Sequence, residues 1–159
     1  MARSNAREAA MQVLYARMLG GDTDRTTLQD MIAFAPDADD LDYMQHIIDG
    51  AWTAAETLDE RIGAFARNWP VARMAKVDLA ILRIAAYELL QREDIPTAVA
   101  INEAVELSRR FSSDESGAFI NGILGNMARA AGAENEAKDE AKDEAKNGAA
   151  DETRIGANA

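Results

Sequence analysis

Residues 77–90 have the sequence VDLAILRIAAYELL, which is apolar nearly all the way round a helix. Three charged residues interrupt it at intervals of five: Asp78, Arg83 and Glu88. Five positions correspond to about 140° of helical rotation, so these side chains cannot pair along their own helix. The segment therefore predicts a central buried helix whose charged groups find partners on other elements.

Apolar residues also recur at steps of three and four on both sides of this segment, which indicates further helices. No window alternates with period two for long enough to form a strand, so the predicted fold class is all-α. The expected helices run from a capping box at Asn5 and Glu8 to Gly20-Gly21, from a second capping box at Thr26 and Gln29 to Pro36, from Asp39 or Asp40 toward Trp69, from Ile95-Pro96 through Leu107, and from Asp114 to Met127.

The domain organisation is read from breaks and composition along the 159 residues. Trp69-Pro70 divides a domain of residues 1–132 into subdomains of about 1–69 and 70–132. Residues 133–159 contain eight acids and four bases, with repeats of EAKD and no apolar stripe. We expect a disordered acidic tail, or at most a fraying helix in solvent.

The composition excludes most enzyme and metal chemistry. The chain has no cysteine and one histidine, His46, which we interpret as structural rather than as a metal ligand. No phosphate-binding glycine loop or nucleophile motif is present. We therefore expect a protein without catalytic activity, metal, cofactor or small-molecule substrate. With no membrane-spanning run and no signal peptide, its expected location is the cytoplasm.

Four acidic residues in one loop could suggest a calcium site: Asp37, Asp39, Asp40 and Asp42. A calcium-binding loop of the helix–loop–helix type would need an oxygen ligand at position 41 and a glycine at position 42. The chain has Leu41 and Asp42 there. We interpret the segment as a solvated loop that caps a helix.

The N-terminal segment is basic in an acidic protein. Arg3, Arg7 and Arg17 are offset only by Glu8, so the first twenty residues carry +2 while the whole chain carries −11. Positive charge opposes the dipole at a helix N-terminus, so these arginines do not serve helix stability. They are candidates for a small, local nucleic-acid site, the alternative being a solvated helix start.

A second candidate site is the segment FSSDESGAF, residues 111–119. It is a polar turn with a phenylalanine at each end, and it leads into a helix whose free N–H groups could bind a phosphate or a base edge. The alternative is a helix cap with two core phenylalanines.

Several strings of residues together resemble the NusB family of transcription antitermination factors over roughly residues 3–130. They are ARE (6–8) with QVLY (12–15), LRIAAYEL (82–89), DIP (94–96), VAINEAVEL (99–107) and FINGIL (119–124). The resemblance implies two small helical bundles packed at an angle, with about six to seven helices. It also implies a factor that binds boxA RNA of ribosomal RNA leader transcripts with the ribosomal protein NusE. Together with other Nus factors, that pair tethers the RNA to elongating RNA polymerase.

The resemblance also assigns residues to two surfaces. The RNA-binding surface falls on Arg3, Arg7, Glu115, Ser116 and Phe119, and the NusE surface falls around Tyr15 and Asp78. The chain departs from the family in having fewer N-terminal arginines and in having Ala118 where a basic residue is familiar. The alternative function is a helical protein-interaction adapter with little or no RNA binding of its own. We do not expect the NusB-like module of a ribosomal RNA methyltransferase, because no cofactor-binding segment is present.

Overall fold

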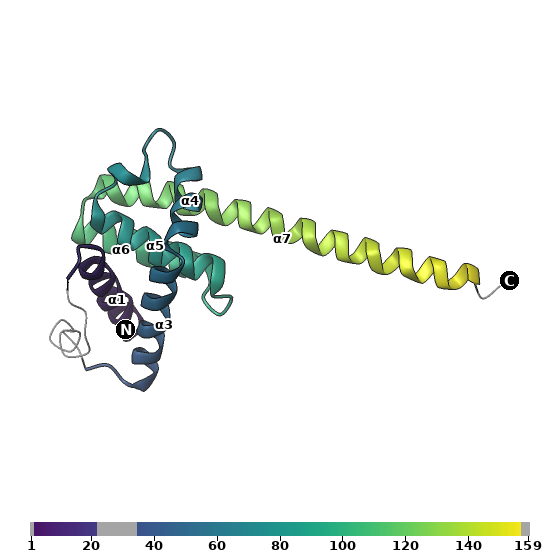
Figure 1. Ribbon diagram of the computed structural model, residues 1–159, viewed down its shortest axis with the longest axis horizontal. Helices are drawn as coiled ribbons and strands as arrows, with labels where there is room; N and C mark the ends of the chain where they lie inside the picture. Colours follow the sequence, from purple (N-terminus) through teal and green to yellow (C-terminus); the bar gives the residue numbers. More distant parts are fainter. Residues whose placement is uncertain (1, 22–34, 157–159) are drawn as a thin grey trace. The chain divides into compact units, whose positions relative to one another are not determined.

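The computed structural model describes residues 2–21 and 35–156 (Figure 1). Every regular element within these ranges is helical, which confirms the all-α fold class. The helix predicted from Thr26 onward lies outside the described residues. The elements are α1 (Ala2–Met18), α3 (Ala38–Thr53), α4 (Ala55–Phe65), the short 3-10 helix η1 (Val71–Arg73), α5 (Lys76–Gln91), α6 (Thr97–Phe111) and α7 (Asp114–Gly156).

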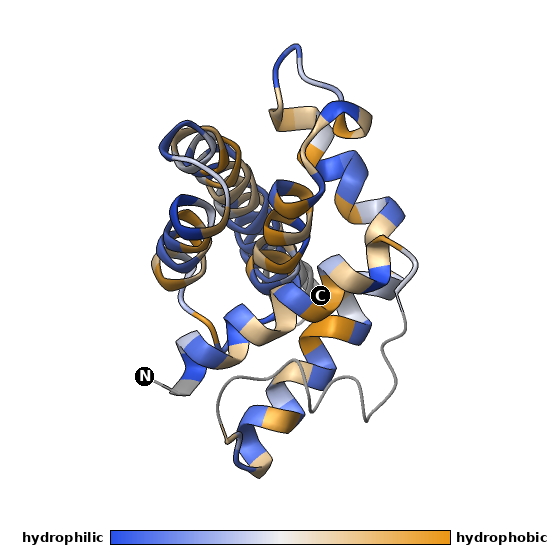
Figure 2. Ribbon diagram, turned by 90° about the vertical axis from the view of Figure 1, so that its left-hand side faces the viewer, coloured by the Kyte–Doolittle hydropathy of each residue, from blue (hydrophilic) through white to orange (hydrophobic). Residues whose placement is uncertain are grey.

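Helix α5 is the centre of the first compact unit, which ends at Met127. It packs against α1, α3, α4 and α6, and nine of its 16 residues are buried. Apolar positions gather on the sides of these helices that face one another (Figure 2). The prediction of a central buried helix is confirmed. Because α5 contacts elements on both sides of Trp69-Pro70, the division into subdomains 1–69 and 70–132 stays a prediction.

Helix α1 ends where the sequence predicts but begins earlier. Gly20 adopts a left-handed conformation with φ of 78°, which terminates the helix as expected. The predicted capping box at Asn5 is wrong, because α1 already begins at Ala2. Tertiary contacts hold the extra turn: the Ser4 hydroxyl donates to Glu103 at 2.6 Å, and the Arg3 guanidinium lies over the ring of Tyr43.

The single long helix predicted from Asp39 or Asp40 toward Trp69 is two helices. α3 and α4 are separated at Ala54, whose φ and ψ of −90° and 9° leave the helical region. Buried Ala51 and Leu58 keep helical spacing across this break, so periodicity could not reveal it. Trp52, which belongs to the same apolar pattern, is 45% exposed.

The N-cap of α3 is Asp37 rather than Asp39 or Asp40. Its side chain accepts a hydrogen bond from the backbone N–H of Asp40 at 2.8 Å, and Asp40 accepts in return from the N–H of Asp37 at 3.2 Å. This reciprocal capping box assigns two of the acidic residues to helix initiation.

The last two helices begin where the sequence predicts, after Ile95-Pro96 and at Asp114. Helix α7 continues past the predicted end at Met127 and through the EAKD repeats to Gly156. The second compact unit starts at Ala128, and all residues from Gly132 to Gly148 are exposed. Within its own unit this stretch therefore has no buried face. None of the described helices is long and apolar enough to span a bilayer.

Candidate functional site

The three charges of α5 each contact a different element. Asp78 accepts a hydrogen bond from the Ser116 hydroxyl of α7 at 3.0 Å. Arg83 forms a bidentate pair with Asp59 of α4, at 2.8 and 2.6 Å. The carboxylate of Glu88 binds α1 and α3. The prediction that these charges pair across elements rather than along α5 is confirmed.

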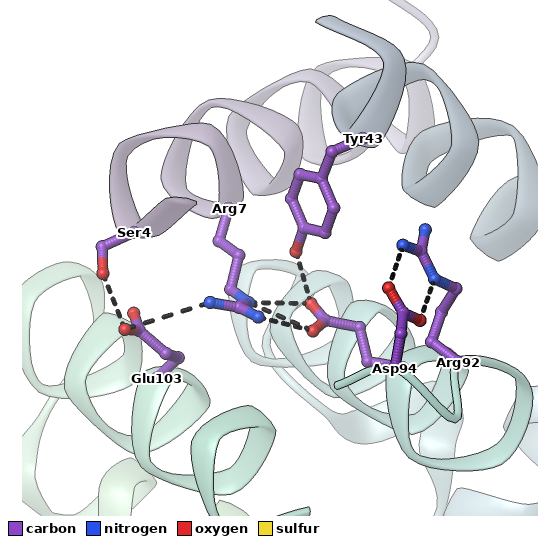
Figure 3. Close-up of polar contacts among 7 residues, drawn as sticks. Ser4, Arg7, Tyr43, Arg92, Asp94 and Glu103 are labelled. Carbon is purple, nitrogen blue, oxygen red and sulfur yellow. Dashed lines mark hydrogen bonds and ion pairs between the residues drawn. The ribbon is translucent and has the colours of Figure 1, made fainter. Parts of the chain in front are cut away.

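Arg7 is the α1 partner of Glu88, and the pair lies inside the protein. Arg7 is 4% exposed and Glu88 is 1% exposed. The Nε of Arg7 donates to both carboxylate oxygens at 3.0 and 3.1 Å, and Nη2 donates to Oε2 at 3.0 Å. The hydroxyl of Tyr43 on α3 donates to Oε1 at 2.7 Å (Figure 3). One carboxylate thus joins three helices.

Burial and charge act on this network in opposite directions. Burial works against the charged form of Arg7, but its hydrogen bonds to Glu88 and the charge of Glu88 outweigh this and raise the pKa of Arg7. Burial, reinforced by the charge of Glu88, raises the pKa of Tyr43 well above its usual value. Tyr43 therefore stays a neutral donor while Arg7 and Glu88 stay charged.

Two further arginines surround the ring of Tyr43. The Arg3 guanidinium carbon lies 4.2 Å from the ring centre and that of Arg92 lies 5.9 Å away. Arg92 is neutralised by a bidentate pair with Asp94 at 2.8 and 2.7 Å, and this pairing lowers the pKa of Asp94 to about 2. Arg3 is exposed and forms no ion pair within the described part of the chain. Its charge is therefore available to a ligand.

A separate open pocket of about 560 Å³ lies beside the first turn of α7. Ser116, Glu115 and Phe119 line it from α7, and Asp78 lines it from α5. The other lining residues are Arg67, Trp69, Arg73, Met74, Ala75 and Ser113. The structure thus brings together three residues of the predicted RNA-binding surface and one residue of the predicted partner surface.

Asp78 is the most unusual group in this pocket. It is 7% exposed, and its Oδ2 accepts the hydrogen bond from Ser116. Its Oδ1 is buried without a hydrogen-bond partner. An unpaired buried acceptor is costly, so this carboxylate can gain a donor from a ligand.

The sequence matches the NusB family over residues 4–129. It is 43% identical over 135 residues to the transcription antitermination protein NusB of Oleidesulfovibrio alaskensis, covering 80% of this chain and 88% of that protein. It is 40% identical over 130 residues to the protein of the same name from Acetivibrio thermocellus, covering 81% and 90%. The chain belongs to the NusB family.

Solved structures of NusB proteins share the fold. NusB of T. maritima is 29% identical and superposes with a TM-score of 0.72, covering 81% of this chain and 92% of that one. A NusB chain solved as "Antitermination Factors NusB and NusE in complex with dsRNA" is 23% identical, with a TM-score of 0.72, covering 81% and 97%. This chain therefore has the NusB fold and belongs to a family of transcription antitermination proteins.

The NusB-family residues expected to bind RNA do not form one group in the structure. Arg3 is exposed and Arg7 is buried beneath it, while Glu115, Ser116 and Phe119 line the pocket. The guanidinium of Arg7 is fully engaged by Glu88, which leaves it no route to a phosphate in this conformation. Its position on α1 suits it to holding the turn that carries Arg3.

The two residues expected at the NusE surface differ in accessibility. Tyr15 is half-buried on α1 and packs against the core, while Asp78 belongs to the pocket. No hydrogen bond or ion pair links them among the described contacts. Ala118, where the family often has a basic residue, is exposed and adds no charge.

Sequence reasoning did not find Trp69, Arg67 or Arg73 as site residues. Trp69-Pro70 was interpreted only as a helix break, although Trp69 is 47% exposed and lines the pocket. A large aromatic residue next to two arginines in an acidic chain was the available signal.

His46 has a structural partner. Its Nε2 lies 3.2 Å from the hydroxyl of Tyr87 on α5. Within residues 2–21 and 35–156, no three metal-binding side chains gather into a possible metal site.

Proposed function

We propose that this NusB-family chain binds boxA RNA of ribosomal RNA leader transcripts together with the ribosomal protein NusE. The bound pair, with other Nus factors, tethers the RNA to the elongating polymerase and suppresses premature termination. No chemical step is involved. A second attachment point raises the effective concentration of the RNA at the polymerase, which is sufficient for the effect.

The observation that carries this proposal is the pocket beside α7. It combines two aromatic side chains, Trp69 and Phe119, with two exposed arginines in a protein of net charge −11. Exposed aromatics next to cationic groups are the usual means of holding single-stranded nucleic acid. The NusB relatives and the NusB–NusE–RNA complex of the same fold support the choice of RNA and of NusE.

The charge distribution implies that RNA binding is weak without the partner. At the N-terminus only Arg3 is free to reach a phosphate, since Arg7 is buried and paired. A basic ribosomal protein docked near Tyr15 would extend the positive surface. The complex should then bind RNA more tightly and with a steeper salt dependence than the chain alone.

The deciding experiment is fluorescence anisotropy with a short boxA RNA over a salt series, for the chain alone and with NusE. We expect NusE to increase both the affinity and the slope of log affinity against log salt concentration. Unchanged affinity and slope with NusE would contradict joint RNA loading. Absence of RNA binding under both conditions would favour a protein-interaction adapter.

A further inference from the structure

The pocket beside α7 has a floor that can only accept hydrogen bonds or share hydroxyl protons. Asp78 contributes a buried carboxylate with an unpaired Oδ1, and Ser113 and Ser116 contribute hydroxyls. The two arginines that line the pocket, Arg67 and Arg73, are exposed. A ligand that binds this floor must therefore bring hydrogen-bond donors of its own.

The pocket has aromatic side chains on two elements. Phe119 comes from the second turn of α7 and is half-buried against the core. Trp69 comes from the turn after α4, where its N–H donates to the carbonyl of Ala66 at 3.2 Å. Asn68 in this turn has φ of 59°, a left-handed conformation that asparagine tolerates better than most residues. The turn thus presents a 47% exposed indole at the pocket.

The surrounding charges favour an anionic polymer over a free cationic ligand. Neither Arg67 nor Arg73 forms an ion pair with another described residue. Both can therefore approach phosphates on either side of a base seated in the pocket. Glu115 lies at the same pocket and opposes this attraction, so the cationic contribution is small.

We propose that this pocket binds a single unstacked guanine base of the RNA, held by Trp69 and Phe119 and read by the carboxylate of Asp78. This inference rests on the proposed RNA-binding function and names the base that the site selects. The Watson–Crick edge of guanine carries two adjacent donors, N1–H and the N2 amino group, which match the two oxygens of a carboxylate. Adenine, cytosine and uracil place an acceptor beside their donor, and that acceptor would face the carboxylate.

Ser116 provides the means for the base to enter. Its hydroxyl now donates to Asp78, but it also lies 3.0 Å from the Ser112 hydroxyl and 3.1 Å from that of Ser113. When guanine donates to Asp78, the Ser116 hydroxyl can turn its proton to one of these neighbours. The exchange leaves no new buried donor without a partner, and it gives the unpaired oxygen of Asp78 a route to one.

The test combines a change in the base with a change in the protein. Each guanosine of a boxA RNA is replaced in turn by inosine, which lacks only the N2 amino group, and affinity is measured with NusE present. One inosine should weaken binding about tenfold, the usual effect of losing one base-reading hydrogen bond. In the Asp78→Asn variant, guanosine and inosine at that position should bind equally, because the amide no longer matches the two donors.

A spectroscopic measurement reports on the pocket itself. The chain has two tryptophans, so in Trp52→Phe the fluorescence comes from Trp69 alone. Stacking of the base should quench this fluorescence, and the quenching should be lost when the critical guanosine is removed. Trp69→Leu should weaken RNA binding about tenfold, within the range for loss of one stacking contact. Trp52→Leu, at a residue 45% exposed but outside this pocket, is the matched control and should not weaken it.

The outcomes separate this inference from the function on which it rests. Tight binding of boxA RNA with no penalty for inosine at any position overturns the guanine pocket and leaves the proposed function standing. The same holds if the inosine penalty persists in Asp78→Asn, because another group must then read the base. If unmodified boxA RNA does not bind with NusE present, the proposed function itself fails. Ser116→Ala checks the exchange: it should keep or increase guanosine affinity, whereas a purely structural role predicts a loss.

Discussion

Arg7 and Glu88 lie 81 positions apart in the sequence and meet as a buried, bidentate ion pair between α1 and α5. Tyr43 adds a third helix to the same carboxylate through its 2.7 Å hydrogen bond. The network lies directly below the turn that carries Arg3, whose guanidinium rests on the Tyr43 ring. A residue expected to touch RNA thus lies inside the fold and positions one that can.

Arg7→Ala should destabilise the protein by about 3–5 kcal/mol, because it leaves the carboxylate of Glu88 buried without its cationic partner. Chemical denaturation followed by circular dichroism measures this loss. The double variant Arg7→Met with Glu88→Leu removes both charges and should recover much of the stability. The matched control is Arg110→Ala, since Arg110 pairs with Glu8 at the exposed surface at 2.8 Å. That pair is worth about 0–1 kcal/mol. Equal losses for Arg7→Ala and Arg110→Ala would show that the buried pair does not hold α1.

Tyr43 should make the stability depend on pH in the alkaline range. Its pKa is raised in the folded state, so its contribution is fully present below the unfolded value of about 10 and is lost as the pH rises through the folded value. Above pH 10 the free energy of unfolding should fall by up to about 1.4 kcal/mol per pH unit from this group. Tyr43→Phe should lack this component, although it costs about 1.5–3 kcal/mol at neutral pH through the lost hydrogen bond to a charged group. Denaturant titrations of both proteins between pH 9 and pH 11 compare the slopes, and parallel curves would exclude the effect.

The sequence predicts the charges of α5 better than their surroundings. Spacing alone shows that Asp78, Arg83 and Glu88 need partners on other elements, and the structure supplies one for each. Spacing cannot say which residue supplies the partner, because that choice depends on helix packing between residues far apart in the chain. Arg7 therefore looked like a surface cation by its position, while its burial follows from a carboxylate 81 positions away.

The break in the predicted long helix has a similar cause. Ala51, Leu58 and Ile62 keep a helical period, so the pattern carries no sign that the backbone changes direction at Ala54. Local capping competes at the start of the same segment, where three nearby aspartates could each serve and Asp37 does. Trp69 was predicted as a boundary because proline follows it, and its exposure is set by the turn around it. Helix existence follows from apolar spacing, while caps, breaks and pocket residues follow from tertiary contacts.

Arg83→Ala should cost less than Arg7→Ala. The sequence predicts a buried pair, but the side chains of Arg83 and Asp59 are 14% and 27% exposed, so solvent screens part of their attraction. We expect a loss of about 1–3 kcal/mol in a denaturant melt, between the values for surface and buried pairs. Asp59→Asn should give a similar loss, and the double variant should cost little more than either single change. Additive losses would show that the two residues do not act as a pair.

Removal of the tail after Gly132 should leave the thermal midpoint of the first unit unchanged within about 2 °C, which for a domain of this size corresponds to well under 1 kcal/mol. Residues 132–148 are all exposed, so their removal uncovers no core. The deleted segment carries eight acids and four bases, so the net charge changes from −11 to −7. Calorimetry on the full and shortened chains makes the comparison. A midpoint lowered by many degrees would mean that the tail contributes to folding.

The salt dependence of RNA binding distinguishes the roles of the site residues. Each phosphate contact on a single strand contributes about −0.7 to the slope of log affinity against log salt concentration. Arg3→Ala should therefore flatten the slope by about 0.7. Arg7→Lys, which keeps the charge, should leave the slope of the folded fraction unchanged, because the side chain is 4% exposed and reaches no phosphate. Phe119→Leu retains packing against the core but removes the stacking face, so binding should weaken by about 1–3 kcal/mol at every salt concentration. Anisotropy titrations of these variants, with Arg110→Ala as an arginine outside the site, measure both quantities. A slope that flattens with Phe119→Leu, or stays unchanged with Arg3→Ala, would place the phosphate contacts elsewhere on the protein.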